Sequence, residues 1–199
     1  SDMENIRGTM ESLDKEAFSM AAELIQNAKK IYIVGIRSCE PLADFLGFYL
    51  NMLFDEVHVV RTNSASEIFE QLMRIGAGDV LIGISFPKYS MRTVKAMELA
   101  NSRSAGVISI TDSIHSPLNL YSSCNLIARS EMASVVDSLT APLSVINALI
   151  VALCLRNQDS LKQSIDTLDQ LYDDYQVYGR DEMDPFDGEI EIFHQGSKV

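Results

Sequence analysis

Short apolar runs alternate along the chain with longer stretches in which apolar residues recur every three or four positions. The runs lie at 31–35, 56–61, 80–85, 106–112 and 125–129. They contain many β-branched residues and are bounded by polar residues or glycine, which predicts strands of a buried sheet. The stretches between them have the 3.6-residue period of amphipathic helices. We expect helices at 5–30 (in two parts), 42–53, 64–75, 91–101, 132–156 and 161–172.

The alternation of predicted strands and helices indicates an α/β fold. Consecutive parallel strands need a crossover connection, and these crossovers are right-handed, so helices cover both faces of the sheet. We therefore expect a three-layer α/β/α sandwich with a five-stranded parallel sheet. Residues 1–28 are expected to form an N-terminal helical segment, 29–178 the main domain and 179–199 an acidic C-terminal tail.

The helix predicted at 132–156 is apolar around more of its circumference than packing on one sheet face requires. Pro142 lies within it, and we expect this proline either to kink the helix or to open its main segment. The excess apolar surface, with a further amphipathic helix after it, predicts a homodimer or higher homo-oligomer.

The loop between the strand at 80–85 and the following helix carries candidate ligand-binding residues. Ser85 ends the strand, and Ser90 is the expected N-cap of the helix. Lys88 and Tyr89 lie between them. A helix N-terminus presents unpaired backbone N–H groups and favours an anion. Two hydroxyls, a cation and a phenol at this place predict a phosphate site. The alternative is a capped turn whose polar residues are only solvated.

Other loops are expected at the same edge of the sheet. In open parallel sheets, ligands bind beyond the carboxyl ends of the strands. The segments that qualify are 37–40, 85–90 and 111–116, and all three contain hydroxyl groups. The first two lead directly into predicted helices, so two helix N-termini can converge on one phosphate.

Composition narrows the partners and the chemistry. The 199 residues carry a formal net charge of −12 without a cluster of Lys and Arg, so this chain is a poor candidate for binding DNA or RNA. Three cysteines without a CxxC pair and only three histidines predict no metal site, no cofactor and a reducing compartment. No apolar run approaches the roughly 20 residues of a membrane span, and no secretory pattern is seen. We therefore expect a cytoplasmic protein without membrane contact.

Three segments of the sequence resemble a known family. KIYIVGIRS at 30–38, GDVLIGISFPKYS at 78–90 and VISITDSIHSPL at 107–118 look like the sugar isomerase (SIS) domain. They are most similar to its version in RpiR-type bacterial transcriptional regulators. The resemblance implies a flavodoxin-like strand topology, dimerisation and a sugar phosphate bound as effector. In those regulators an N-terminal helix-turn-helix domain binds DNA. That domain would precede Met3, so we expect it to be missing from this chain.

The resemblance also implies which residues contact the ligand. The family's phosphate contacts are serines of the first and third strand-to-helix loops, which correspond here to Ser38, and to Ser85 and Ser90. Arg37 stands where a second glycine usually precedes the serine, and a Pro-Lys pair at 87–88 replaces the usual Ser-Gly. The bulkier, cationic loop either tightens phosphate binding, changes which sugar fits, or accepts an anion other than a sugar phosphate.

Three functions are compatible with these features. The first is a non-catalytic, effector-binding domain of a regulator. The second is a phosphosugar isomerase, which needs a general base and a general acid; Glu131, placed about where isomerases of the family have their base, and His115 are the candidates. The third is an interaction domain with the helix at 132–156 as its subunit face. We favour the first, because no assured acid accompanies Glu131. The predicted ligand-binding residues are Arg37, Ser38, Ser85, Lys88, Tyr89, Ser90 and Glu131.

Overall fold

A five-stranded parallel sheet forms the centre of the computed structural model, which describes residues 1–61, 64–131, 137–175 and 177. The strands are β1 (Ile31–Gly35), β2 (Val57–Val59), β3 (Val80–Ile84), β4 (Gly106–Thr111) and β5 (Cys124–Ile127). Their order is β2-β1-β3-β4-β5, and every neighbouring pair is parallel. This is the flavodoxin-like order. The predicted three-layer α/β/α fold is confirmed.

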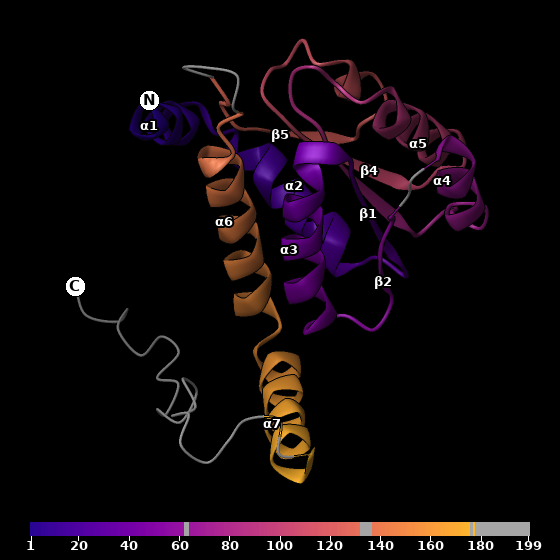
Figure 1. Ribbon diagram of the computed structural model, residues 1–199, viewed down its shortest axis with the longest axis vertical. Coiled ribbons are helices and arrows are strands. Elements are labelled where there is room, and N and C mark those ends of the chain that lie inside the picture. Colours follow the sequence, from indigo (N-terminus) through magenta and orange to yellow (C-terminus); the bar gives the residue numbers. More distant parts are fainter. Residues whose placement is uncertain (62–63, 132–136, 176, 178–199) are drawn as a thin grey trace. The chain divides into compact units, whose positions relative to one another are not determined.

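Helices cover both faces of this sheet (Figure 1). Those of the described chain are α1 (Asp2–Ser12), α2 (Lys15–Gln26), α3 (Glu40–Asn51), α4 (Ala65–Gln71), α5 (Met91–Ser102), α6 (Thr140–Arg156) and α7 (Gln158–Tyr175), with short 3₁₀ turns at Arg37–Cys39 and Pro117–Leu120. Helices α2, α3 and α6 pack on one face, and α4 and α5 on the other.

Alternate residues of each strand enter two separate cores. Ile31 and Ile33 of β1 pack with α2, α3 and α6, whereas Tyr32 and Val34 pack with α4 and α5. Because successive side chains of a strand point to opposite faces, a sheet covered on both sides requires an uninterrupted apolar run. The short apolar runs of the sequence therefore identified the strands.

The helix predicted at 132–156 begins later than expected. Helix α6 starts at Thr140, and 137–139 are not helical; 132–136 lie outside the described residues. Pro142 is therefore the third residue of α6. A proline in the first helical turn removes an N–H that has no intrahelical partner, so it opens the helix without kinking it.

The remaining boundaries shift by a few residues. The predicted helix at 5–30 is divided as expected, and the Asp14 carboxylate caps α2 by accepting from the N–H groups of Glu16 and Ala17 at 2.9 and 3.0 Å. Helix α4 ends at Gln71, although the prediction extended it to residue 75. Strand β2 is shorter than predicted, and β5 begins one residue earlier and ends before Ala128.

Residues Ser1–Leu161 form one compact unit and Lys162–Val199 a second. In the first unit, α2 buries Ala21 and Ile25 in the same core as the sheet. The domain boundaries expected after residues 28 and 178 stay predictions, and the expected acidic tail at 179–199 lies outside the described residues. Helix α7 has no buried residue. Within the described chain no single helix is long and apolar enough to cross a membrane; only α6 and α7 taken together reach that length and composition.

Candidate functional site

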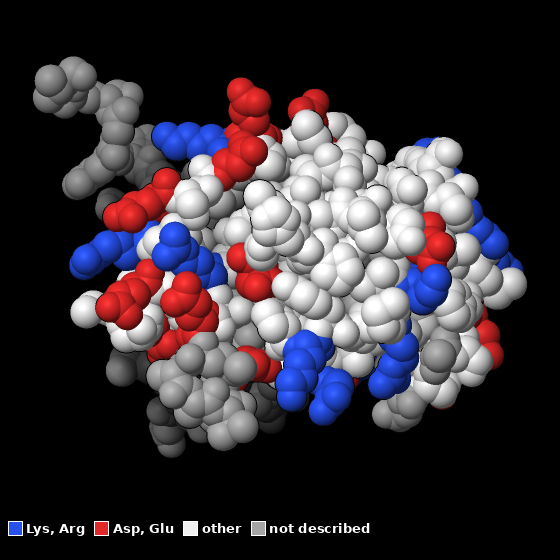
Figure 2. Space-filling view, turned by 90° about the horizontal axis from the view of Figure 1, so that it is seen from above, with Lys and Arg blue, Asp and Glu red and all other residues white. Residues whose placement is uncertain are grey.

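A pocket of about 460 Å³ opens where the strands end. It is lined by Pro87, Asp112, Arg129, Ser130, Glu131 and Asp137. These residues follow β3, β4 and β5 or precede α6, as expected for a ligand site at the carboxyl edge of a parallel sheet. Figure 2 looks down on the upper end of Figure 1, where α6 begins. Charged side chains of both signs gather there on the side of α1, beside a broad area without charge.

The loop from β3 to α5 links two of the predicted site residues, Ser85 and Ser90. The buried Ser85 hydroxyl accepts a hydrogen bond from the Ser90 N–H at 3.0 Å. The Ser90 hydroxyl in turn caps α5 by accepting from the Thr93 N–H at 3.4 Å. In both contacts the serine oxygen is the acceptor, so each hydroxyl keeps its hydrogen for donation to a ligand. Lys88 is exposed in the same loop, and no ion pair joins it to a described residue.

The Tyr89 phenol, which is predicted to face an anion, makes a hydrogen bond to a carboxylate of the protein. Its hydroxyl donates to Asp112 Oδ1 at 2.8 Å. Burial, followed by this contact with the Asp112 carboxylate, raises the pKa of Tyr89 to about 12. The tyrosine therefore connects the loop after β3 with the loop after β4. Its partner Asp112 is one of the residues that line the pocket.

The first strand-to-helix loop contains a strained residue. Arg37 has a φ of 61°, a left-handed conformation that is unfavourable for residues with a side chain and tolerated by glycine. Next to it, the Ser38 hydroxyl donates to Asp137 Oδ2 at 3.1 Å. The hydrogen that the predicted phosphate contact would use is therefore held by a carboxylate of the pocket. A phosphate at Ser38 has to compete with Asp137 for that hydrogen.

The remaining pocket residues were not identified from the sequence. Arg129, Ser130 and Asp137 belong to segments that have no recognisable helix cap or motif. For Arg129 and Ser130, only their position shortly after the last strand could have drawn attention to them. Together the pocket carries three carboxylates, which accept hydrogen bonds from sugar hydroxyls, and one guanidinium, which can hold an anion.

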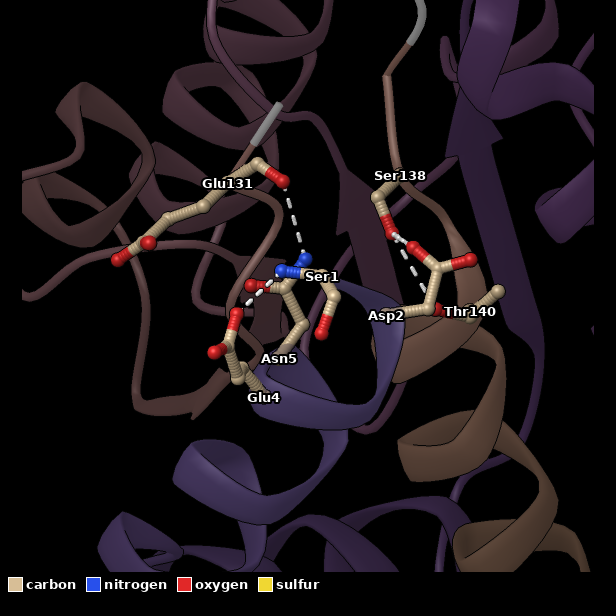
Figure 3. Close-up of polar contacts among 7 residues, drawn as sticks. All are labelled: Ser1, Asp2, Glu4, Asn5, Glu131, Ser138 and Thr140. Atoms are coloured by element: carbon tan, nitrogen blue, oxygen red, sulfur yellow. Dashed lines mark hydrogen bonds and ion pairs between the residues drawn. The ribbon is translucent and has the colours of Figure 1, made fainter. Parts of the chain in front are cut away.

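Helix α1 contacts both ends of the segment that precedes α6 (Figure 3). The buried Asn5 side chain donates to the backbone oxygen of Glu131 at 3.1 Å, and Ser138 Oγ donates to Asp2 Oδ1 at 2.7 Å. The Glu131 carboxylate extends away from α1. One turn further along α1, the buried Thr9 hydroxyl accepts from the Arg129 N–H at 2.9 Å. Helix α1 thus makes hydrogen bonds to the backbone of two residues that line the pocket.

The two candidate catalytic residues are not brought together in the pocket. Glu131 lines it, whereas His115 is exposed in the loop after β4 and is not among the lining residues of the described chain. The Cys39 thiol is buried, which raises its pKa and keeps it protonated. Among the described residues, no group of three His, Cys, Asp or Glu side chains could hold a metal ion.

Comparison with known proteins places these features in a family. A model of the SIS domain matches residues 24–152, which is well over half of the chain. An uncharacterized HTH-type transcriptional regulator of Caldanaerobacter subterraneus is 27% identical over 174 residues. The match covers 83% of this chain and 60% of that regulator, so the chain spans less than two thirds of the relative's length.

Solved structures with the same fold include two regulators. The sugar isomerase domain of an RpiR transcription factor from Sphaerobacter thermophilus has a TM-score of 0.81 and 26% identity, covering 85% of this chain and 94% of that one. The Vibrio vulnificus NanR protein, complexed with ManNAc-6P, has a TM-score of 0.75 and 18% identity, covering 85% and 66%. At 18% identity, the likeness to NanR shows a shared fold and no more. The predicted resemblance to the SIS domain of RpiR-type regulators is confirmed, and the chain belongs to the SIS domain family.

Proposed function

We propose that this chain is the sugar-phosphate-binding effector domain of an RpiR-type transcriptional regulator. The β3–α5 loop carries the proposal: the Ser85 and Ser90 hydroxyls and the N-terminus of α5 form a cradle of donors for a phosphate. The adjoining pocket supplies carboxylates for the hydroxyls of the sugar. In this proposal DNA is bound only by a helix-turn-helix domain outside this chain, and the chain pairs with a second copy.

The relatives support this assignment at different levels. The Caldanaerobacter protein is named as an HTH-type regulator, and the Sphaerobacter structure is the sugar isomerase domain of an RpiR factor. NanR, which shares the fold, was solved with a sugar phosphate. These names describe the relatives, and extending a sugar-phosphate effector to this chain is our inference.

Calorimetric titration tests the proposal. The panel comprises the 6-phosphates of glucose, fructose, N-acetylglucosamine and N-acetylmannosamine, with the free sugars and inorganic phosphate as references. We expect at least one sugar phosphate to bind and the matching free sugar not to bind. Ser90→Ala should weaken this binding. Ser102→Ala, at the other end of α5, should not, because the one bond of the Ser102 hydroxyl to a described residue goes to the Leu99 backbone oxygen. Absence of binding across the panel would contradict the proposal.

The alternative function is a phosphosugar isomerase. One observation favours it: Glu131, the candidate base, lines the pocket. The candidate acid His115 does not line it, so we retain the sensor as the better-supported function.

A further inference from the structure

Helix α1 is held in place by polar groups rather than by an apolar stripe. Its buried residues are Asn5, Gly8 and Thr9, none of which has a large apolar side chain. Met3 and Met10 are about three-quarters exposed, at 75% and 74%. Burial of apolar area therefore contributes little to the docking of this helix. Directional contacts must supply most of the preference for the docked position.

Two of the hydrogen bonds made by α1 reach one segment of the pocket wall, residues 129–131. Asn5 and Thr9 are one helical turn apart and face the same side. Asn5 holds the Glu131 carbonyl and Thr9 holds the Arg129 N–H, so the two bonds bracket Ser130. The backbone on which two pocket side chains are mounted is thus fixed from α1.

Gly8 completes this contact. A Cβ atom at Gly8 would lie 2.6 Å from Arg129 Cζ, so a larger residue there would displace the guanidinium from its present position against the helix. The Arg129 side chain also lines the pocket. Its position therefore depends on α1 through two separate contacts, one with its backbone and one with its side chain.

We propose that Asn5 and Thr9 are positioning residues of the ligand pocket, and that ligand binding and α1 docking stabilise each other. The proposal rests on the proposed function, because it names the regulation of the same site. If the pocket binds its ligand better with α1 docked, the ligand must favour the docked helix by the same factor. Because α1 buries few apolar groups, we expect that removing one hydrogen bond lowers the docked fraction and, with it, the apparent affinity.

The polar character of the contact suits this role. A hydrogen bond requires one register of the helix, whereas an apolar face tolerates several. A helix that buries few apolar groups also opens at low cost in free energy. A change in the pocket wall can therefore change how firmly helix α1 docks.

The test combines affinity and hydrogen exchange on the whole chain. Asn5→Ala and Thr9→Val are compared with Ser12→Ala. Among the described residues, the Ser12 hydroxyl bonds within α1 alone, to the Gly8 backbone oxygen. The ligand is the tightest binder of the sugar phosphate panel. Each of the first two variants should bind it roughly three- to tenfold more weakly, as expected for one lost hydrogen bond. Ser12→Ala should bind it as the wild type does. Ligand should also slow amide exchange in α1 of the wild type.

The outcomes separate this proposal from the proposed function. Wild-type binding with unchanged affinity in Asn5→Ala and Thr9→Val would overturn the role of α1 and leave the function standing. Without ligand, Thr9→Val should speed exchange of the Arg129 amide, since that group loses its acceptor. If this exchange accelerates but no sugar phosphate binds the wild type, the proposed function fails and the coupling fails with it. An unchanged Arg129 amide would overturn the positioning role directly.

Discussion

The Tyr89 hydroxyl donates to Asp112 Oδ1 at 2.8 Å and thereby joins the loops that follow β3 and β4. Thr111 Oγ1 approaches the same oxygen at 3.3 Å, so Asp112 is held from two sides. Asp112 lines the pocket. A residue that the sequence suggested as a ligand contact therefore also organises the pocket wall, and this role can be measured without a ligand.

Tyr89→Phe should lower the free energy of unfolding by about 1–2 kcal/mol near neutral pH, because it removes a hydrogen bond to a charged group. It should also change the pH dependence. The pKa of Tyr89 is raised to about 12, from 10.0 for a solvated tyrosine. The folded state therefore keeps the proton that the unfolded state has lost. This contribution is complete below about pH 10 and disappears as the pH rises through about 12.

Urea unfolding at several pH values between 8 and 12 measures both effects. Between pH 10 and 12 the wild type should lose more stability than Tyr89→Phe. Tyr49→Phe is the control, since Tyr49 lies at the surface and contacts the exposed Phe48 and the half-buried Phe45 through its ring. Parallel pH profiles of the wild type and Tyr89→Phe would mean that the Asp112 contact does not form in solution.

The strands of the sheet could be predicted from the sequence because each one is encoded by a run of consecutive residues. Ile31 to Gly35 and Val80 to Ile84 are buried along their whole length, so each strand is a visible apolar run. The positions of Ser85 and Ser90 were visible for a similar reason, because Ser85 follows the end of β3 and Ser90 is the N-cap of α5. Local patterns of this kind do not require knowledge of the rest of the fold.

The rest of the site depends on contacts between distant parts of the chain. Ser38 and Asp137 are 99 positions apart, Thr9 and Arg129 are 120 apart, and Asn5 and Glu131 are 126 apart. In the sequence Asn5 and Thr9 look like ordinary polar residues of an exposed helix. Only the packed structure shows that they are buried and which backbone groups they bind.

We expect the chain to be a dimer in solution. Val151 and Leu155 of α6 and Phe48 of α3 remain 45–63% exposed, and the two helices pack side by side. At micromolar concentration, light scattering should give twice the 22.1 kDa of the chain. Val151→Asp should shift the mass towards the monomer. Met73→Asp, at another exposed apolar position that follows α4, should not. A wild-type monomer would contradict the prediction.

We expect no isomerase turnover. Glu131 lines the pocket without the candidate acid His115, and ring opening and proton transfer between C1 and C2 need both an acid and a base. A coupled assay for interconversion of glucose 6-phosphate and fructose 6-phosphate checks this. Turnover above background that disappears in Glu131→Gln would establish the enzyme in place of the sensor.

Arg37→Gly should make the fold more stable and, if Arg37 contacts the ligand, weaken ligand binding. Arg37 is strained by its φ of 61°, which glycine adopts without strain. The variant should therefore gain about 0.5–1 kcal/mol in unfolding free energy. If the Arg37 guanidinium contacts the anion, the affinity for the sugar phosphate should fall by roughly tenfold. Ser104→Gly is the matched control, because Ser104 has the same φ and lies beyond the end of α5. It should be stabilised to a similar degree and bind normally. Unchanged affinity in Arg37→Gly would remove Arg37 from the site.

Lys88→Ala tests whether the cation of the β3–α5 loop binds the phosphate. Lys88 is exposed and makes no ion pair with a described residue, so its removal should hardly change stability. A charge-assisted contact with a phosphate dianion is worth roughly 1.5–3 kcal/mol. The affinity should therefore fall by roughly ten- to a hundredfold, at about 1.4 kcal/mol for each factor of ten. Lys88→Arg should keep most of it, since the charge is retained.

The matched control for Lys88 is Lys95→Ala on α5. Lys95 is exposed like Lys88, but its ammonium group pairs with Glu98 at 2.6 Å, one turn along the helix. An exposed pair of this kind contributes little to stability, so both alanine variants should unfold nearly as the wild type does. Calorimetric titration then compares two proteins that have each lost one surface charge. If both variants bind the sugar phosphate as tightly as the wild type, Lys88 is a solvated residue, and the serine hydroxyls and the N-terminus of α5 hold the phosphate alone.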